Sequence, residues 1–425
     1  MIDKRFIELV LTEQKEEAEL RLSECVISRD EENLVNLDSD LAQVVMGVRR
    51  CGKSTLCFNV LKKSGVKFGY VNFDDERLIS GSVDDLNNIL EILYKINGHF
   101  THLFLDEAQN IEGWHLFVNR LLRKGMKILI TGSNAKLLSH ELSTHLTGRY
   151  DAIEVFPFSF KEFCEFNSID RNLLTTSGIA VLRDSFDRYL KSGGFPEILK
   201  GASPKRYIDN LTGNILNRDI RQRYKLRYFS SFSRLSYHLL NVVPYIVSVA
   251  NLSELVGIKS PQTIKNYIDY LTEAYLLLEL KKFSFKSRLR LTDEKLYAID
   301  VALMDNRRDA MSAENIGWRL ETIIFLHLIR RSQVEDFDLF YYKKDSRSKE
   351  CDFLKCKGNK VEAIYQVAYS ISNPKTKKRE INALLELAQS TGCEKLYLVT
   401  DFEREILEID TKIVKIIPAY EYLLQ

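Results

Sequence analysis

The stretch "GVRRCGKS", Gly47 to Ser54, decides how the first part of this 425-residue chain folds. It fits the pattern G-x-x-x-x-G-K-[ST] at every fixed position. Glycines let a loop wrap around a phosphate so that successive backbone N–H groups point inward. In such a loop Lys53 reaches the β and γ phosphates of a nucleotide, and the Ser54 hydroxyl is a ligand for Mg²⁺. The stretch therefore predicts a nucleotide-binding loop.

The segments on either side of this loop match the setting that the motif requires. The apolar run "QVVM" precedes it as a strand, and "STLCFNVLKK" follows as a helix that begins near Lys53. The amino end of that helix adds a partial positive charge, which favours phosphate. A glycine turn before an ordinary helix is the weaker interpretation. The candidate nucleotide-binding residues are Gly47, Arg50, Gly52, Lys53, Ser54 and Thr55.

Short apolar strands alternate with helical stretches over residues 40–155. The expected strands are "LAQVVM", "FGYVNF", "HLFLD", "KILIT" and "AIEVF". Strands that alternate with helices form βαβ units and a mainly parallel sheet. The fold class expected for this part is therefore α/β, with the phosphate loop after its first strand.

Two acidic residues, Asp106 and Glu107, follow the strand "HLFLD" directly. Ligands of open α/β sheets bind at the carboxyl ends of the strands. Asp106 is expected to hold Mg²⁺ through water, and Glu107 to polarise the water that attacks the nucleotide. The alternative is that these two acidic residues are solvent-exposed at a strand end and have no functional role.

Further polar candidates follow the next two strands. "KILITGSNA" ends in Thr131, Ser133 and Asn134, and a polar side chain here would report on the γ-phosphate or orient the water. In "LTGRY", Arg149 is a candidate for stabilising the developing charge, within the subunit or across an interface. A structural ion pair is the alternative for Arg149. The candidate catalytic residues are Lys53, Glu107, Asn134 and Arg149, and the metal candidates are Ser54 and Asp106.

The order of these blocks resembles an AAA-type ATPase family of bacteria and archaea. The blocks are "GVRRCGKSTL", "VNFDDERL", "FLDEAQNIEGW", "ILITGSNAKLL", "LTGRY", "FPFSFKEF" and "GGFPEIL". The resemblance covers residues from about 40 to 400, and it implies a winged-helix segment and a carboxyl-terminal domain of uncharacterised function. It also implies ATP binding and hydrolysis but no biological role. The implied Walker A residues are Gly47, Gly52, Lys53 and Ser54, and the implied Walker B residues are Asp106 and Glu107.

The segment from "NLSELVG" to "LLLELKKF" has the spacing of a helix-turn-helix. Ser260 is expected to cap a second helix that has Pro261 at its first position. Ile264, Tyr267, Ile268 and Leu271 fall at helical spacing and should face the core, whereas Gln262, Thr263, Lys265 and Asn266 should face outward. The basic residues expected in a β-wing are Lys281, Lys282, Lys286, Arg288 and Arg290. Duplex DNA and a protein partner remain alternative ligands.

The carboxyl-terminal part is expected to run as a helix, three strands, a helix, two strands and a helix. This order resembles the restriction-endonuclease-like core, in which clustered acids hold Mg²⁺ and a lysine steadies the developing charge. Glu321 and Asp352 remain as acids, but Gln366 and Ala368 stand where an acid and a lysine would be needed. Neither Glu350 nor Glu362 restores the lysine. The expectation is a nuclease-like domain without catalysis, binding a partner or nucleic acid.

Composition sets the remaining limits. Apolar residues make up 45% and charged residues 28% of the chain, and the net charge of +2 gives no strong polyanion signal. Apolar runs fall short of the roughly 18 to 20 residues of a membrane span. The amino terminus has no signal-peptide core, which favours the cytoplasm. Seven cysteines without a C-x-x-C pair indicate reduced thiols.

These patterns together predict five segments and an ATP-dependent switch or motor. The segments are an amino-terminal helical segment at 1–35, the ATPase core at 36–155, a helical lid at 156–245, the winged helix at 246–295 and the nuclease-like domain at 296–425. Expected ligands are ATP and Mg²⁺, with duplex DNA, a protein or a second copy of the chain as partners and no membrane. The alternatives are a nucleotide-gated DNA-binding regulator, an active ATP-dependent nuclease and a signalling scaffold with slow ATP turnover.

Overall fold

The computed structural model describes residues 2–78, 81–133, 146, 148–284, 294–305, 315–343 and 350–425. The chain divides into two units, each described below by itself. Unit 1 comprises Met1–Phe156 with Glu273–Tyr275, and unit 2 comprises Pro157–Thr272 with Leu276–Gln425. No helix in the described ranges combines the length and apolarity that crossing a membrane requires.

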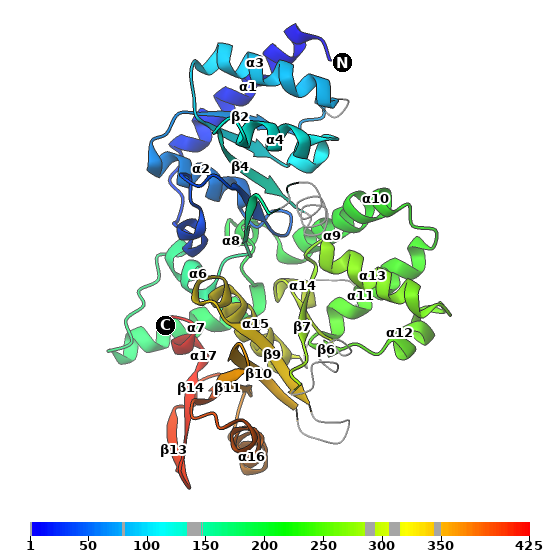
Figure 1. Ribbon diagram of the computed structural model, residues 1–425. Coiled ribbons are helices and arrows are strands. Elements are labelled where there is room, and N and C mark those ends of the chain that lie inside the picture. Colours follow the sequence, from blue (N-terminus) through cyan, green and yellow to red (C-terminus); the bar gives the residue numbers. More distant parts are fainter. Residues whose placement is uncertain are drawn as a thin grey trace. The chain divides into compact units, whose positions relative to one another are not determined.

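Unit 1 is built around a five-stranded parallel sheet (Figure 1). Its strands are β1 (Ala42–Met46), β2 (Phe68–Asn72), β3 (His102–Asp106), β4 (Lys127–Gly132) and β5 (Tyr150–Glu154). The order across the sheet is β2-β3-β4-β1-β5, so all five predicted strands form and the α/β prediction is confirmed. β1, β3 and most of β4 are buried, as expected for strands that helices cover on both faces.

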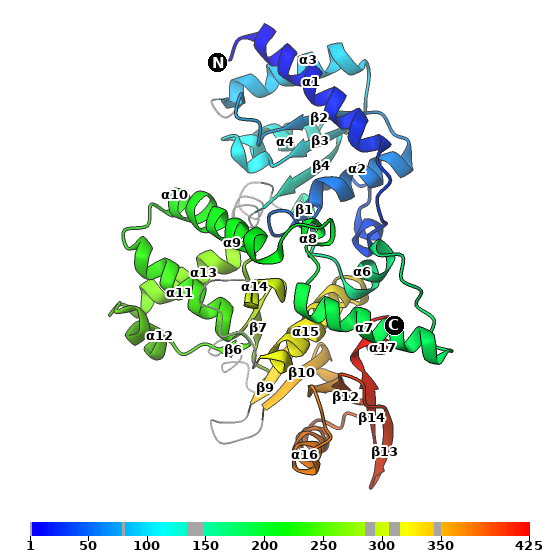
Figure 2. The same ribbon diagram turned by 180° about the vertical axis from the view of Figure 1, so that it is seen from behind.

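Helices cover this sheet. They are α1 (Lys4–Ser23), α2 (Lys53–Ser64), α3 (Val83–Asn97) and α4 (Trp114–Leu122), with the short turns η1 (Asp30–Leu34) and η2 (Ala108–Asn110). α1 packs on α2, α3 and β2, and it lies in the foreground in the reverse view (Figure 2). α2 begins at Lys53, as predicted, so its amino end faces the loop that leaves β1.

Unit 2 begins with helices and a small sheet. The helices are α6 (Phe160–Phe166), α7 (Thr176–Ser192), α8 (Pro196–Leu199), α9 (Pro204–Asn214), the π-helical stretch η4 (Ile215–Arg221), α10 (Gln222–Tyr224), α11 (Phe229–Val242), α12 (Val249–Val256), α13 (Pro261–Glu273) and α14 (Ala302–Asp305). The strands are β6 (Tyr245–Ile246), β7 (Leu277–Lys281) and β8 (Glu294–Ala298), in the order β6-β8-β7. The two helices predicted for the helix-turn-helix segment therefore form.

The rest of unit 2 is a six-stranded mixed sheet with a helix on either face. Its elements are α15 (Ile316–Glu335), β9 (Asp338–Lys343), β10 (Glu350–Lys357), β11 (Lys360–Val367), α16 (Pro374–Thr391), β12 (Leu396–Thr400), β13 (Glu405–Ile409), β14 (Lys412–Pro418) and α17 (Ala419–Tyr422). The strand order is β13-β14-β12-β11-β10-β9. The expected order had one strand fewer, because β13 and β14 form a hairpin that turns at Asp410, in the left-handed region with φ 55°.

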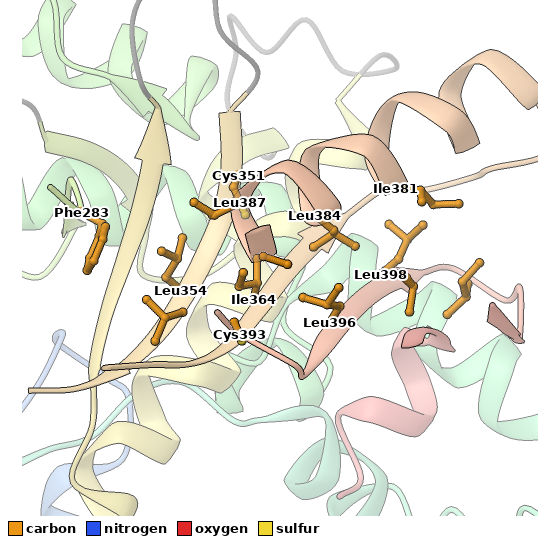
Figure 3. Packing of buried hydrophobic residues seen from close by; sticks show 14 of the residues in the cluster. Phe283, Cys351, Leu354, Ile364, Ile381, Leu384, Leu387, Cys393, Leu396 and Leu398 are labelled. Carbon is orange, nitrogen blue, oxygen red and sulfur yellow. The ribbon is translucent and has the colours of Figure 1, made fainter. Parts of the chain in front are cut away.

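The core between α16 and this sheet is mainly aliphatic. Leu384 and Leu387 of α16 lie against Ile364 of β11 and Leu396 of β12 (Figure 3). Three buried thiols, those of Cys351, Cys356 and Cys393, belong to the same cluster. All seven cysteines of the chain are free; six of them are buried, as expected for core thiols, and Cys25 is exposed.

A buried histidine makes the stability of unit 2 dependent on pH. Burial and the nearby charges of Arg331 and Arg330 lower the pKa of His327 on α15 to about 3. Between the ordinary value of about 6.5 and this value, the unfolded chain binds a proton that the folded chain does not. We therefore expect the stability that neutral His327 provides above pH 6.5 to be lost as pH falls, by about 2 kcal/mol between pH 6.5 and 5.

Urea unfolding in a Trp114→Phe background, where Trp318 of α15 reports on unit 2, measures this loss. His327→Leu should lose about 2 kcal/mol less than the wild type over the same pH interval. Equal losses in the two proteins would show that His327 carries none of the pH dependence.

Candidate nucleotide-binding site

The loop between β1 and α2 is held close to the end of β5. A Cβ placed on Gly47 would lie 2.1 Å from the Val155 carbonyl oxygen, so only glycine fits at this position. Gly52 precedes α2 in the left-handed region with φ 100°, which glycine adopts without strain. The motif therefore requires glycine at its two fixed positions for different physical reasons.

Lys53 lies at the start of α2 with its ammonium turned back into the loop. Its Nζ donates to the carbonyl oxygens of Gly47 and Val48, each at 3.2 Å, and lies 3.8 Å from Glu107 Oε1. Its side chain is 4% exposed. A buried cation next to backbone N–H groups at a helix amino end is suited to a phosphate.

Asp106 at the end of β3 is joined to the loop and to β4 by hydroxyl groups. Ser54 Oγ donates to Asp106 Oδ1 at 2.8 Å, and Thr131 Oγ1 donates to the same oxygen. Tyr70 OH reaches Asp106 Oδ2 at 3.4 Å. Burial, and then the neighbouring charge of Glu107, raises the pKa of Asp106 to about 6. The predicted Mg²⁺ ligands Ser54 and Asp106 thus lie side by side, and their oxygen atoms fit a magnesium ion.

Glu107 points its carboxylate at the cation of the loop. Besides the 3.8 Å approach to Lys53, its Oε2 accepts from Gln109 Nε2 at 2.5 Å, and its backbone N–H donates to Thr131 Oγ1 at 2.9 Å. Burial works to raise the pKa of Glu107, but the charges of Lys53 and Arg49 and the bond from Gln109 outweigh it and lower the pKa. Glu107 is therefore held ionised beside the phosphate loop.

A buried arginine from the amino-terminal segment braces the loop from behind. Arg29 Nη1 donates to the Cys51 carbonyl at 3.2 Å, and its Nη2 donates to the Phe156 carbonyl at 2.8 Å. Its side chain is 4% exposed and lies 3.6 Å from Glu31. Arg29 therefore ties the phosphate loop to the residue at which the chain leaves unit 1.

The structure brings most of the predicted site residues together, with two exceptions. Gly47, Gly52, Lys53, Ser54, Asp106 and Glu107 converge at the carboxyl ends of β1 and β3, with Thr55 half-buried and Arg50 exposed next to them. Asn134 lies outside the described residues. Arg149 is exposed at the amino ends of β1 and β5, opposite to the ends that carry the loop. There its carbonyl accepts from Ala42 N at the start of β1.

Of the two alternatives for Arg149, its position disfavours action within its own subunit. β5 runs parallel to β1, with Tyr150 opposite Ala42 and Glu154 opposite Met46. Arg149 is therefore separated from the loop by the length of a strand, about 16 Å. A role across a subunit interface remains a prediction.

Three further residues of this site were not identified from the sequence. They are Arg29, Arg49 and Gln109. Arg49 lies on the loop 3.8 Å from Asp74, and its position inside the motif was a usable signal. Gln109 belongs to the block "DEAQN", two residues after Glu107. Arg29 carries no local signal, because the charged stretch around it contains no recognisable motif.

A second charged cluster lies in unit 2, around the acids expected from a nuclease-like centre. Lys295 Nζ of β8 lies 2.6 Å from Glu321 Oε1 and 2.5 Å from Glu350 Oε1. Tyr297 OH donates to Glu321 Oε1 at 2.7 Å. Burial would lower the pKa of Lys295, but the carboxylates of Glu321, Asp352 and Glu350 outweigh it and raise the pKa.

An ammonium in this cluster was not anticipated from the sequence. It comes from β8 rather than from the strand that carries Gln366 and Ala368. Gln366 Nε2 donates to Glu380 Oε2 at 2.9 Å, and Asp352 Oδ2 accepts from the Val367 N–H at 2.8 Å. Within the described ranges, no three acidic, histidine or cysteine side chains are grouped so as to hold a metal ion.

Comparisons with known proteins place the chain in a family. Residues 39–164 match an AAA domain, and residues 183–312 match a domain of unknown function, DUF8612. An uncharacterized protein of Methanocaldococcus jannaschii is 35% identical, over 100% of this chain and 96% of the relative. An uncharacterized protein of Haemophilus influenzae is 30% identical, over 95% of this chain and 100% of the relative. The chain belongs to an AAA-type P-loop ATPase family.

Solved structures similar to parts of this family member are more distant. The Walker-type ATPase of Pyrococcus abyssi is 16% identical, covers 65% of this chain and 95% of its own, and has a TM-score of 0.44. AMPPCP-bound DnaA of Aquifex aeolicus is 18% identical over 57% of this chain and 85% of its own, with a TM-score of 0.29. The RuvB Holliday junction branch migration motor of Thermotoga maritima is 16% identical over 63% and 88%, also with a TM-score of 0.29.

Proposed function

We propose that this protein binds ATP with Mg²⁺ and hydrolyses it. The observation that carries the proposal is that Ser54 contacts Asp106 and Lys53 approaches Glu107, beside a loop whose first glycine cannot be replaced without a clash. Phosphoryl transfer needs positioning and charge stabilisation more than covalent chemistry from the protein. These residues supply both.

Each residue has a separate role in this proposal. Lys53 gives up its carbonyl contacts and its approach to Glu107, and neutralises the β and γ phosphates instead. Ser54 and Asp106 would hold Mg²⁺, which neutralises phosphate charge when bound. Glu107, freed from Lys53 but still held by Gln109, orients the attacking water and accepts its proton. Thr131 keeps Asp106 and Glu107 in register with each other.

We also propose that nucleotide state changes the conformation of the segments that follow unit 1. The support for this is Arg29, which bonds both the loop carbonyl of Cys51 and the carbonyl of Phe156. A loop that tightens around phosphates moves Cys51, and Arg29 transmits the movement to the end of β5. In an oligomer, Arg149 of one copy of the chain would reach the nucleotide bound to another copy.

Glu107→Gln tests the hydrolysis proposal. The amide keeps the shape of the side chain but cannot accept a proton, so turnover should fall about 100-fold or more while ATP binding persists. The measurement is phosphate release with Mg²⁺ and ATP, beside the affinity for a fluorescent ATP analogue.

Glu112→Gln is the matched control, because Glu112 is exposed in the same loop, five residues on. It should turn over ATP as the wild type does. Unchanged turnover in Glu107→Gln would remove Glu107 from the mechanism, and loss of binding in both proteins would point to misfolding instead.

A second function, contact with duplex DNA through α12 and α13, is favoured by the exposure of α13. Ile264, Tyr267, Ile268 and Leu271 are buried, whereas Gln262 and Lys265 are exposed near the start of the helix. That distribution suits a recognition helix of a winged helix. Of the basic wing, Lys281 and Lys282 are described, and Lys286, Arg288 and Arg290 lie outside the described residues.

We propose that the carboxyl-terminal sheet is a nuclease-like domain that does not cut nucleic acid. Lys295 stands among Glu321, Glu350 and Asp352, where a divalent ion would have to lie, and satisfies two of the three carboxylates. The active-nuclease alternative requires that this ammonium give way to a metal ion.

A further inference from the structure

The stretch from Arg218 to Ser248 is a strongly basic part of unit 2 that the proposed function leaves unused. It carries six basic residues and a single acidic residue, Asp219, so its net charge is +5 in a chain whose total is +2. The basic residues are Arg218, Arg221, Arg223, Lys225, Arg227 and Arg234, on η4, α10, α11 and the turn between the last two. Five of the six are exposed, and Arg223 is half-buried.

Two of these cations lie over aromatic rings. Arg221 lies over the Phe229 ring at 4.7 Å, and Arg227 lies over the Tyr228 ring at 5.4 Å. Within the described ranges none of the six forms an ion pair, and Arg223 Nη1 is buried without a hydrogen-bond acceptor. Among the described residues, these six cations are therefore not paired with carboxylates, and Arg223 Nη1 has no hydrogen-bond acceptor.

The basic stretch packs directly beside the outward face of α13. The rings of Tyr224 and Tyr270 stack at 3.9 Å with an angle of 13° between them. Tyr270 stands four residues after Asn266 and eight after Gln262, so the three lie along one face of the helix. Gln262 Nε2 donates to Asn266 Oδ1 at 2.8 Å. The cations around Tyr224 thus flank the face that the proposed DNA contact would present to bases.

The basic stretch continues into a hollow on α11. The hollow has a volume of about 590 Å³, and Ser230, Arg234, His238 and Asn241 line it at helical spacing. These side chains offer hydrogen-bond donors, and Tyr228 is exposed at 52% at its amino end. A concave surface with donors and one cation is suited to an oxyanion of a backbone.

We propose that residues 218–241 bind the sugar–phosphate backbone of duplex DNA beside α13. Phosphate contacts from arginine and lysine fix the position of a protein on a duplex, and base contacts then give specificity. The basic stretch supplies the first kind of contact and α13 the second, so the inference rests on the proposed DNA contact of α13 and extends it.

The test uses the full chain and a labelled duplex of about 30 base pairs, titrated over a range of salt concentrations. Arg218→Gln, Lys225→Gln and Arg234→Gln are combined, because these three cations are exposed and make no ring contact. We expect binding to weaken at least about tenfold, and the dependence of log affinity on log salt to lose about 0.9 for each phosphate contact removed. ATP turnover without DNA should not change.

The matched control is the triple variant Lys357→Gln, Lys360→Gln and Lys378→Gln, which removes the same charge from exposed positions of the carboxyl-terminal sheet and α16. It should bind the duplex as the wild type does. Equal weakening in both triple variants, an unchanged salt dependence in the first, or a preference for single strands of the same length would overturn the proposal. A Gln262→Ala, Lys265→Gln variant tests α13 separately, so loss there alone would leave α13 as the DNA contact and refute the basic stretch.

Discussion

Lys53→Ala is expected to lower Mg²⁺-dependent ATP turnover by about 100- to 1000-fold, the loss typical when one preorganised donor to a developing charge is removed. Lys53 is the cation that the loop buries, with its Nζ 3.2 Å from two loop carbonyls and 3.8 Å from Glu107. Alanine leaves the phosphates without this charge and leaves Glu107 without its counter-ion. The affinity for ATP should fall together with turnover, in contrast to Glu107→Gln.

Lys62→Ala on the same helix is the matched control for this prediction. Lys62 is exposed and donates to the Glu24 carbonyl at 3.0 Å, away from the phosphate loop, so turnover should stay at the wild-type level. Both variants are assayed with and without duplex DNA. Turnover that rises with DNA and vanishes in Lys53→Ala makes this a DNA-coupled ATPase, and turnover indifferent to DNA directs the search to protein partners. Full turnover in Lys53→Ala would contradict the proposed site.

The elements of unit 1 were predictable because their signals are local. Each strand is a short apolar run next to a helix, and alternation of strands and helices leaves a parallel sheet as the expected outcome. The hairpin of β13 and β14 was not predictable in the same way. Residues 405–409 are half-buried or exposed, so they do not show the alternation of buried and exposed side chains that marks a strand. Pairing with β14 decides their structure instead.

The nucleotide site shows the same division between local and distant signals. Lys53, Ser54, Asp106 and Glu107 belong to motifs whose spacing already contains their chemistry. Arg29 stands 22 residues before Cys51 in a segment without a motif, and only the folded chain brings it to the loop. The block that contains Arg149 resembles a family pattern. The register of β5 against β1 places Arg149 at the amino ends of the strands, and the block itself does not reveal that register.

Lys295→Met is expected to lower the free energy of unfolding of unit 2 by about 3 to 5 kcal/mol, the cost of removing one partner from a buried ion pair. The side chain of Lys295 is 5% exposed, and those of Glu321 and Glu350 are 14% and 24% exposed. Methionine fills a similar volume but leaves these carboxylates and Asp352 to repel one another. Adding Glu321→Gln should recover part of the loss, because it removes one of the charges left unpaired.

Lys377→Met is the control, since Lys377 pairs with Glu405 at the surface and such exposed pairs contribute under about 1 kcal/mol. Urea unfolding followed at Trp318 measures all of these variants. The same proteins, incubated with plasmid and Mg²⁺, address the nuclease question. If Lys295→Met loses stability and no protein cleaves the plasmid, Lys295 is a counter-ion that occupies the place of a metal ion. Cleavage by the wild type that Lys295→Met abolishes would instead make Lys295 a catalytic lysine supplied from β8, and would overturn the proposal of an inactive domain.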